Sequence, residues 1–281
     1  MSITLCCDTG IDDALAIAVA RGLDLAVAAI VATAGNADLD TAARNTAGVV
    51  ALCGIGAPVC RGPALPRSGR PHRSASFHGP GGLGGVSTHL PDGAPPREAD
   101  LGALAGDLIV TGPLTVAAEA LEAGAAIERL LWMGGAVHHP GNVTPHAEFN
   151  AWWDPHAVAE VAASGVALDI VPLDVTTTVV LRADDLRRLH EGGQTAHFCG
   201  RAAGYVIEHH DHMYAHDPAT VLAYLRPELF TWERGTLSVD VEGERAGATR
   251  FTAGDGPHRV ALKADVDTVR ELILAAILAC P

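Results

Sequence analysis

Residues 5–13 read Leu-Cys-Cys-Asp-Thr-Gly-Ile-Asp-Asp, and this stretch predicts both a fold and a chemistry. A short apolar strand over Ile3–Cys7 ends in a turn that carries three carboxylates, Asp8, Asp12 and Asp13. The helix dipole favours acids in a first helical turn, which accounts for Asp12 and Asp13 but not for Asp8 at a strand end. Carboxylates this close repel one another unless a cation lies among them. Oxygen ligands suit calcium or magnesium better than zinc, so we expect a hard cation here.

Composition narrows the fold class and the partners. Of the 281 residues, 48% are hydrophobic but only 4% are aromatic, which predicts a core of Ala, Val and Leu as in helices packed on a parallel sheet. The net charge of −14 argues against nucleic acid and anionic membranes as partners. No apolar run approaches the roughly 20 residues of a membrane span, and no basic region precedes the first apolar stretch. We therefore expect a cytoplasmic protein without membrane contact.

The six cysteines include no CxxC pair, so they predict neither a zinc site nor a disulfide framework. We interpret them as small buried apolar residues.

Apolar strands alternate with helical periodicity along the chain, which predicts an α/β fold with an open, mostly parallel sheet and helices on both faces. After the first strand, further strands are expected at Leu25–Ala32, Leu108–Thr111, Leu130–Met133 and Leu168–Val171, and helices at Asp12–Arg21 and Asp38–Cys53.

Two segments depart from this rhythm. Residues 62–98 are rich in Pro, Gly, His and Ser, which is typical of a functional or mobile loop. Near the end, Thr236–Val241 and Val260–Ala264 predict a β-hairpin, and Val266–Ala279 a closing helix. No linker interrupts the pattern, so one domain over residues 1–281 is expected.

In open parallel sheets, ligands bind outside the carboxyl ends of the strands. The residues that follow the predicted strands should therefore converge on one site. They are the acids of the opening turn, Gly35-Asn36, Thr111-Gly112-Pro113 and Met133-Gly134-Gly135.

These segments also resemble, in order, the sequence blocks of the inosine-uridine preferring nucleoside hydrolases. Residues 8–14 resemble the family's DxDPGxDDAxA signature, and five further blocks follow. They are Ala34-Gly35-Asn36, Thr111-Gly112-Pro113-Leu114-Thr115, Met133-Gly134-Gly135, Gly141-Asn142-Val143-Thr144 with Ala147-Glu148-Phe149-Asn150, and His216-Asp217-Pro218.

The resemblance implies calcium-dependent hydrolysis of the N-glycosidic bond of ribonucleosides, giving ribose and free base through an oxocarbenium-like transition state. It implies that Ca²⁺ is held by Asp8, Asp13, Asp217 and the main-chain carbonyl of Thr111. Asp8 would also take the proton of the attacking water. The family further suggests a homo-oligomer, a dimer or tetramer.

The resemblance also assigns the substrate contacts. His216 is placed to protonate the leaving base, and His78 reaches toward that base from the irregular loop. Residues implied to bind the substrate, mostly through ribose hydroxyls, are Asp12, Asn36, Met133, Asn142, Glu148, Phe149 and Asn150. Glu148 near the 5′ end would repel a 5′-phosphate, which favours a nucleoside over a nucleotide.

Several alternatives remain open. Aspartate phosphatases of the haloacid dehalogenase type also begin with a strand and an Asp, but need a second Asp where Gly10 stands. The tract His209–His212 could bind a second metal, although a solvated helix end is the better interpretation. Another ribosyl compound could be the substrate, or the chain could bind nucleosides without turnover.

The chain departs from the family pattern at Cys6, Thr9 and Val116, where the family usually has an acid, a proline and an asparagine. The alignment fails before His216, so Tyr205 and Tyr214 are only candidates for contact with the base. The preference for purine or pyrimidine stays open.

Overall fold

The computed structural model describes residues 3–69 and 76–281. In this part of the chain, one large sheet has the strand order β11-β10-β12-β7-β6-β5-β1-β2-β3-β4, and β8 pairs with β9 in a small second sheet. The strands of the large sheet are β1 Ile3–Cys7, β2 Val27–Ala32, β3 Val59–Arg61, β4 Arg97–Glu98, β5 Ala105–Val110, β6 Ala126–Met133, β7 Ala167–Val171, β10 Phe230–Val239, β11 Thr249–Ala253 and β12 His258–Ala264. The small sheet joins β8 Val180–Leu181 to β9 Met213–Tyr214.

The strands from β12 to β4 are parallel to their neighbours, and β10 and β11 add an antiparallel end. In the middle of the sheet, Leu5 of β1 lies opposite Ile30 of β2 and Ile109 of β5, and all three side chains are buried. Strands covered on both faces read as continuous apolar runs, which is why they were visible in the sequence. The predicted α/β class with a mostly parallel sheet is confirmed.

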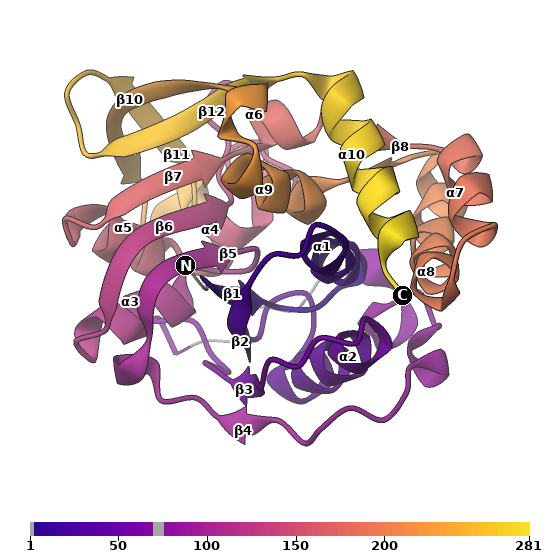
Figure 1. Cartoon of the computed structure of the whole chain (residues 1–281). Helices are drawn as coiled ribbons and strands as arrows, with labels where there is room; N and C mark the ends of the chain where they lie inside the picture. The colour runs from indigo at the N-terminus through magenta and orange to yellow at the C-terminus, as the bar shows by residue number, and fades with distance from the viewer. Residues whose placement is uncertain (1–2, 70–75) are drawn as a thin grey trace.

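Helices cover both faces of the sheet, and each face has its own apolar core. Figure 1 shows α1, α9 and α10 gathered on one side and α3 and α5 on the other. The first group consists of α1 Ile11–Gly22, α2 Leu39–Leu52, α8 Gln194–His210, α9 His216–Leu225 and α10 Val266–Ala279. The second contains α3 Thr115–Glu122 and α5 Pro155–Ala163. Shorter helices are α4 Phe149–Trp153, α6 Leu173–Thr176 and α7 Ala183–His190.

Some predicted bounds change. The predicted hairpin is wrong in its pairing, because Thr236–Val239 pair with β11, which the sequence did not reveal. β12 pairs instead with the preceding part of β10, Phe230–Gly235, so the three strands form one antiparallel unit. The strand expected at Leu108–Thr111 ends at Val110, which leaves Thr111 in the following turn. The closing helix is confirmed as α10. None of the helices described is long and apolar enough to cross a bilayer.

The irregular segment 62–98 has short 3₁₀ turns at Ser76–His78, Pro80–Gly82 and Ser87–His89 and ends in β4. Its residues 70–75 lie outside the described residues.

Candidate active site

A cavity of about 310 Å³ opens at the carboxyl ends of the parallel strands. Asn36 follows β2, Thr111 follows β5 and Met133 ends β6, as the topology rule predicts. Every residue that the resemblance placed at the site lines this cavity except Asp8 and Asp13, which are buried. The predicted lining residues are Asp12, Asn36, His78, Thr111, Met133, Asn142, Glu148, Phe149, Asn150, His216 and Asp217.

At the polar end of the cavity, Asp12, Asp13 and Asp217 each offer an oxygen within 4.8 Å of the others, and all three are buried. Asp12 and Asp13 come from the first turn of α1, and Asp217 from the first turn of α9. The tightest acidic group therefore contains Asp12, whereas the resemblance placed Asp8 in the metal set. Asp8 directly follows β1, and its Oδ1 is buried without a hydrogen-bond partner.

Hydrogen bonds orient the two most deeply buried carboxylates. Asp13 accepts from the Gly10 N–H at 2.8 Å, the Asn36 amide at 3.2 Å and the Thr111 hydroxyl at 2.7 Å. Asp8 accepts from the Asn36 backbone N–H at 2.6 Å through Oδ2. The backbone closes tightly around Asp8, because a Cβ on Gly35 would lie 2.0 Å from Oδ2.

Burial raises the pKa of all four acids. The pKa of Asp12 and that of Asp13 each rise to about 6, chiefly through desolvation. Those of Asp8 and Asp217 rise well above the usual range, through desolvation and then the nearby negative charges of Asp13 and Asp12, respectively. Asp12 and Asp217 each offer an oxygen within 4.8 Å of the other, so the two carboxylates repel each other when both are ionised. A divalent cation would compensate the same charges, so this donor set fits a metal ion.

The neighbouring block is held by backbone groups. Glu148 caps α4, accepting from the N–H groups of Asn150 and Ala151, and also accepts from that of Gly135. Desolvation raises its pKa to about 7. The Asn150 amide donates to the carbonyls of Thr111 at 2.8 Å and Met133 at 3.0 Å, so its own oxygen is left to accept from a ligand.

Asn142 also contributes to this block. Its Oδ1 accepts from the Phe149 backbone N–H at 2.9 Å, which leaves its amide N–H groups as donors.

Two histidines face the cavity from different elements. His78 Nδ1 accepts from the Ile11 backbone N–H at 3.0 Å, and His216 Nδ1 lies 2.7 Å from the Thr176 hydroxyl. Burial lowers the pKa of each ring to about 4, so both are neutral at pH 7. The ring of Phe77 packs edge-on against His78 and stacks on His210 at the end of α8.

Sequence reasoning missed part of the lining. Phe77 and Val143, both 40% exposed, lie at the cavity together with His139 and Thr177. These residues come from irregular segments or from a short helix, where no periodicity distinguishes a lining residue from a surface one. Of the two tyrosines left open, Tyr214 lines the cavity.

Tyr205 has a different place. A Cβ on Gly79 or Gly84 would lie 2.5 Å from its side chain, so Tyr205 packs closely against the loop that carries His78.

The histidine tract lies at the C-terminal end of α8, where His209 and His210 are exposed and Asp211 adopts a left-handed cap conformation. The predicted solvated helix end is confirmed.

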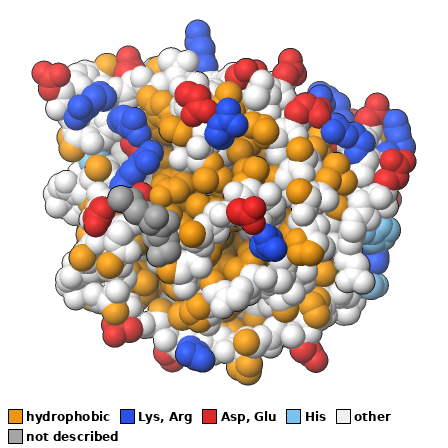
Figure 2. Space-filling view, viewed as in Figure 1, with side chains coloured by type: hydrophobic (Ala, Val, Ile, Leu, Met, Phe, Trp, Pro, Cys, Tyr) orange, Lys and Arg blue, Asp and Glu red, His pale blue; other side chains and the backbone are white. Residues whose placement is uncertain are grey.

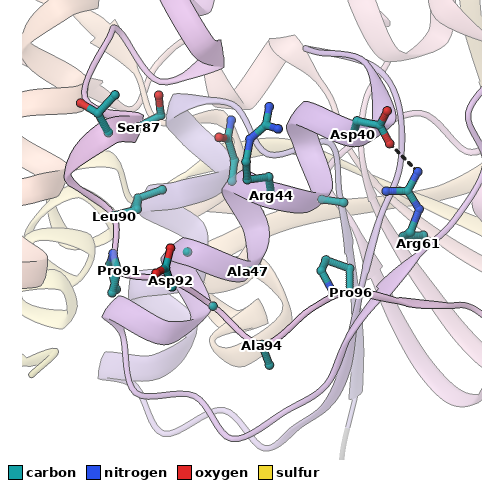
Figure 3. A pocket seen from close by; sticks show the side chains of 15 residues that line it. Asp40, Arg44, Ala47, Arg61, Ser87, Leu90, Pro91, Asp92, Ala94 and Pro96 are labelled. Atoms are coloured by element: carbon teal, nitrogen blue, oxygen red, sulfur yellow. Dashed lines mark hydrogen bonds and ion pairs between the residues drawn. The ribbon is translucent and has the colours of Figure 1, made fainter.

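A larger cavity of about 680 Å³ lies between α2 and residues 87–96, and none of the predicted site residues lines it. Figure 3 shows that two of its charged side chains are paired: Arg61 donates to Asp40 at 2.6 Å. Arg44 donates to the Thr41 hydroxyl at 3.3 Å. This larger cavity lacks the buried acids and histidines that line the cavity of about 310 Å³, so the smaller cavity is the better candidate for an active site.

Comparison with known proteins decides the family. Residues 3–271 match the family model of the inosine-uridine preferring nucleoside hydrolases. The chain belongs to this family. It is therefore an N-ribosyl glycosidase that hydrolyses ribonucleosides, as the sequence predicted.

Individual relatives agree over nearly the whole chain. The non-specific ribonucleoside hydrolase RihC of Escherichia coli O1:K1 is 33% identical, with 95% of this chain and 94% of the relative covered. Uridine nucleosidase 1 of Arabidopsis thaliana is 29% identical, with 96% and 91% covered. The structure of a purine-preferring ribonucleoside hydrolase from Gardnerella vaginalis superposes with a TM-score of 0.91 at 26% identity, covering 99% of both chains.

In this nucleoside hydrolase, the three residues that depart from the family pattern are all packed inside the fold. Cys6 and Val116 are fully buried in the second apolar core. The Thr9 hydroxyl lies 2.6 Å from that of Thr46 in α2, so this residue ties the acidic turn to a helix.

Proposed function

We propose that this nucleoside hydrolase depends on Ca²⁺ held by the carboxylates of Asp8, Asp13 and Asp217 and the main-chain carbonyl of Thr111. One observation carries the proposal: four buried carboxylates with raised pKa values meet at the polar end of a cavity of about 310 Å³. Four such charges cannot all ionise there without a compensating cation. Donors that are all oxygens favour calcium or magnesium.

When bound, such a cation would lower the pKa of a water and orient it with the sugar hydroxyls. Asp8 would take the proton of that water, since its Oδ1 is buried and free of hydrogen bonds. The bond from the Asn36 N–H to Oδ2 leaves Oδ1 for this task.

The remaining polar groups would bind ribose. Asp12 Oδ1 has no partner and would accept from a hydroxyl, with Asn36 beside it. Asn150 would accept through its oxygen and Asn142 would donate through its amide, which suits hydroxyls that both donate and accept. Met133 and Phe149 would pack against the sugar, and Glu148 would disfavour a 5′-phosphate by like charge.

The other end of the cavity would hold the base. His78 and His216 would serve the leaving base as hydrogen-bond donors, because neutral rings carry one N–H each. The exposed apolar side chains of Phe77 and Val143 would contact the base plane, together with Tyr214. Purines and pyrimidines both offer a flat face to such apolar contacts, so these side chains do not select between the two kinds of base.

A homo-oligomer and a cytoplasmic location remain predictions. Figure 2 shows hydrophobic side chains gathered over the middle of one face, with most charged side chains toward its edge and a few among the hydrophobic ones. Such a distribution supports a face that a second copy could cover.

A panel of purine and pyrimidine ribonucleosides, assayed for free ribose with and without a chelator, tests the proposal. We expect ribose release that is lost with the chelator and restored by Ca²⁺. Full activity after thorough metal removal would contradict the calcium role. Nucleoside binding without ribose release would instead favour a binding protein that has lost turnover.

A further inference from the structure

Thr176 is the residue that contacts His216 from outside the cavity. It ends α6, its side chain is fully buried, and its hydroxyl oxygen lies 2.7 Å from His216 Nδ1. His216 begins α9, forty residues further along the chain. The contact therefore joins α6 to α9 through Nδ1 of the His216 ring.

The neighbouring threonines behave differently. Thr177 and Thr178 return their hydroxyls to the helix, donating to the carbonyls of Leu173 and Val175 at 2.7 and 2.6 Å. Among the described residues, the Thr176 hydroxyl bonds only to His216. A threonine near a helix end usually bonds back to its own backbone, so the orientation of Thr176 calls for a separate reason.

The direction of the Thr176–His216 hydrogen bond follows from the need of the buried hydroxyl hydrogen for an acceptor. If the Thr176 hydroxyl accepted a hydrogen bond from an Nδ1–H group, its own hydrogen would be buried without an acceptor, at a cost that is avoided when the hydroxyl donates to Nδ1. Donation requires a lone pair on Nδ1, and a neutral imidazole then carries its hydrogen on Nε2.

We infer that Thr176 is a positioning residue that holds His216 in the Nε2–H tautomer, so that the ring presents a donor to the leaving base. The inference rests on the proposed role of His216 at the base. As the glycosidic bond breaks, negative charge develops on the base, and an N–H aimed at it stabilises the transition state. The opposite tautomer would turn a lone pair toward that charge.

His78 provides an internal reference. Its Nδ1 accepts from the backbone N–H of Ile11, a donor that cannot reverse. His78 must therefore be in the same Nε2–H tautomer, independently of Thr176. His78, from the irregular loop, and His216, from the start of α9, would then each present an Nε2–H donor.

The test is long-range ¹H–¹⁵N spectroscopy of calcium-loaded, histidine-labelled protein at neutral pH, with the His216 signals assigned by their loss in His216→Gln. We expect His216 to show protonated Nε2 and unprotonated Nδ1 in the wild type and in Thr176→Ser. Thr176→Val should mix or reverse this pattern while the His78 signals stay unchanged. Thr178→Val, which removes an exposed hydroxyl next door, is the matched control and should match the wild type.

Kinetics give a second readout. We expect kcat to fall on the order of tenfold in Thr176→Val, with KM nearly unchanged and recovery in Thr176→Ser. Wild-type His216 with protonated Nδ1, or Thr176→Val with an unchanged spectrum, would overturn the inference. A protein that cleaves no nucleoside but shows the expected tautomer would overturn the proposed function and leave the positioning role standing.

Discussion

At Asp8, burial and like charge act in the same direction. The carboxylate is 1% exposed, and both desolvation and Asp13 raise its pKa well above the usual range. A residue this unfavourable to fold stability is retained where it has a function. Stability and activity should therefore respond to its replacement in opposite directions.

For Asp8→Asn, we expect kcat/KM for ribonucleosides to fall by a factor of about 10³, because base and metal ligand are lost together. In the presence of a chelator, the variant should melt at a higher temperature than the wild type. The buried charge at position 8 is gone, while the amide oxygen of the new side chain can still accept from the Asn36 N–H. Ribose assays and thermal melts in a chelator measure both. Equal activity, or a lower melting temperature in the chelator, would contradict this account.

Glu148 connects residue chemistry to pH. Its pKa rises from 4.5 to about 7 in the folded protein because of desolvation. Below pH 4.5 the group is protonated in both folded and unfolded chains. Between pH 4.5 and 7 only the unfolded chain loses the proton, so the free energy of unfolding falls across this window, by about 3 kcal/mol from this group.

We expect Glu148→Gln to flatten this pH dependence. The buried aspartates contribute in the same direction, so the metal-free wild type should lose stability steeply from pH 4.5 to 7. The variant should lose less over the same window, whatever its absolute stability. Urea unfolding in a chelator at several pH values measures the slope, and an unchanged slope would remove Glu148 as a source.

Most of the side chains that the sequence blocks named line one cavity, and their roles in the reaction remain predictions. Asp12, Asp13 and Asp217 meet although about two hundred residues separate the first two from the third along the chain. Thr176 and His139 were not predicted from the sequence. A threonine in a short helix and a histidine in a loop have the same sequence pattern whether they face solvent or a site. Only the folded backbone distinguishes these cases.

At the scale of elements, the turn between β2 and α2 controls the space around Asp8. A Cβ on Gly35 would lie 2.0 Å from Asp8 Oδ2, so Gly35→Ala must displace this carboxylate. We expect kcat/KM to fall on the order of 10- to 100-fold and the calcium concentration for half-maximal activity to rise. Ribose release titrated with Ca²⁺ measures both effects.

Gly204→Ala is the matched control. Gly204 lies inside α8, where the nearest atom to an added Cβ is 3.7 Å away. Alanine there should stabilise the fold by about 0.5–1 kcal/mol and leave the calcium titration unchanged. Equal effects of the two substitutions would show that the Gly35 result reflects general damage.

The strands that are most buried in the structure were the ones that the sequence predicted. The central strands β1, β2, β5, β6 and β7 read as apolar runs. β4 consists of Arg97 and Glu98 at the sheet edge, and only its pairing with β3 makes it a strand. β11 lies at the opposite edge and is mostly exposed, so neither edge carried an apolar signal.

At the scale of the whole molecule, the acidic site joins elements that lie far apart along the chain. Its carboxylates come from the residue after β1 and from the first turns of α1 and α9, and Thr111 lies in the turn after β5. The proposal that residues 1–281 form one domain implies that these parts unfold together. A cation bound among them would then stabilise the whole chain and not one loop.

We therefore expect Ca²⁺ to raise the melting temperature of the whole protein. A concentration one hundred times the dissociation constant adds about 2.7 kcal/mol, which corresponds to roughly 5 °C for a chain of this size. Calorimetry of chelated and calcium-loaded protein should show one transition that moves as a unit. Asp217→Asn should abolish most of the shift, whereas Asp255→Asn, at an exposed surface acid, should keep it. A shift of the same size in both variants would place the stabilising cation elsewhere, and two transitions of which one moves would mean that the site is coupled to only part of the fold.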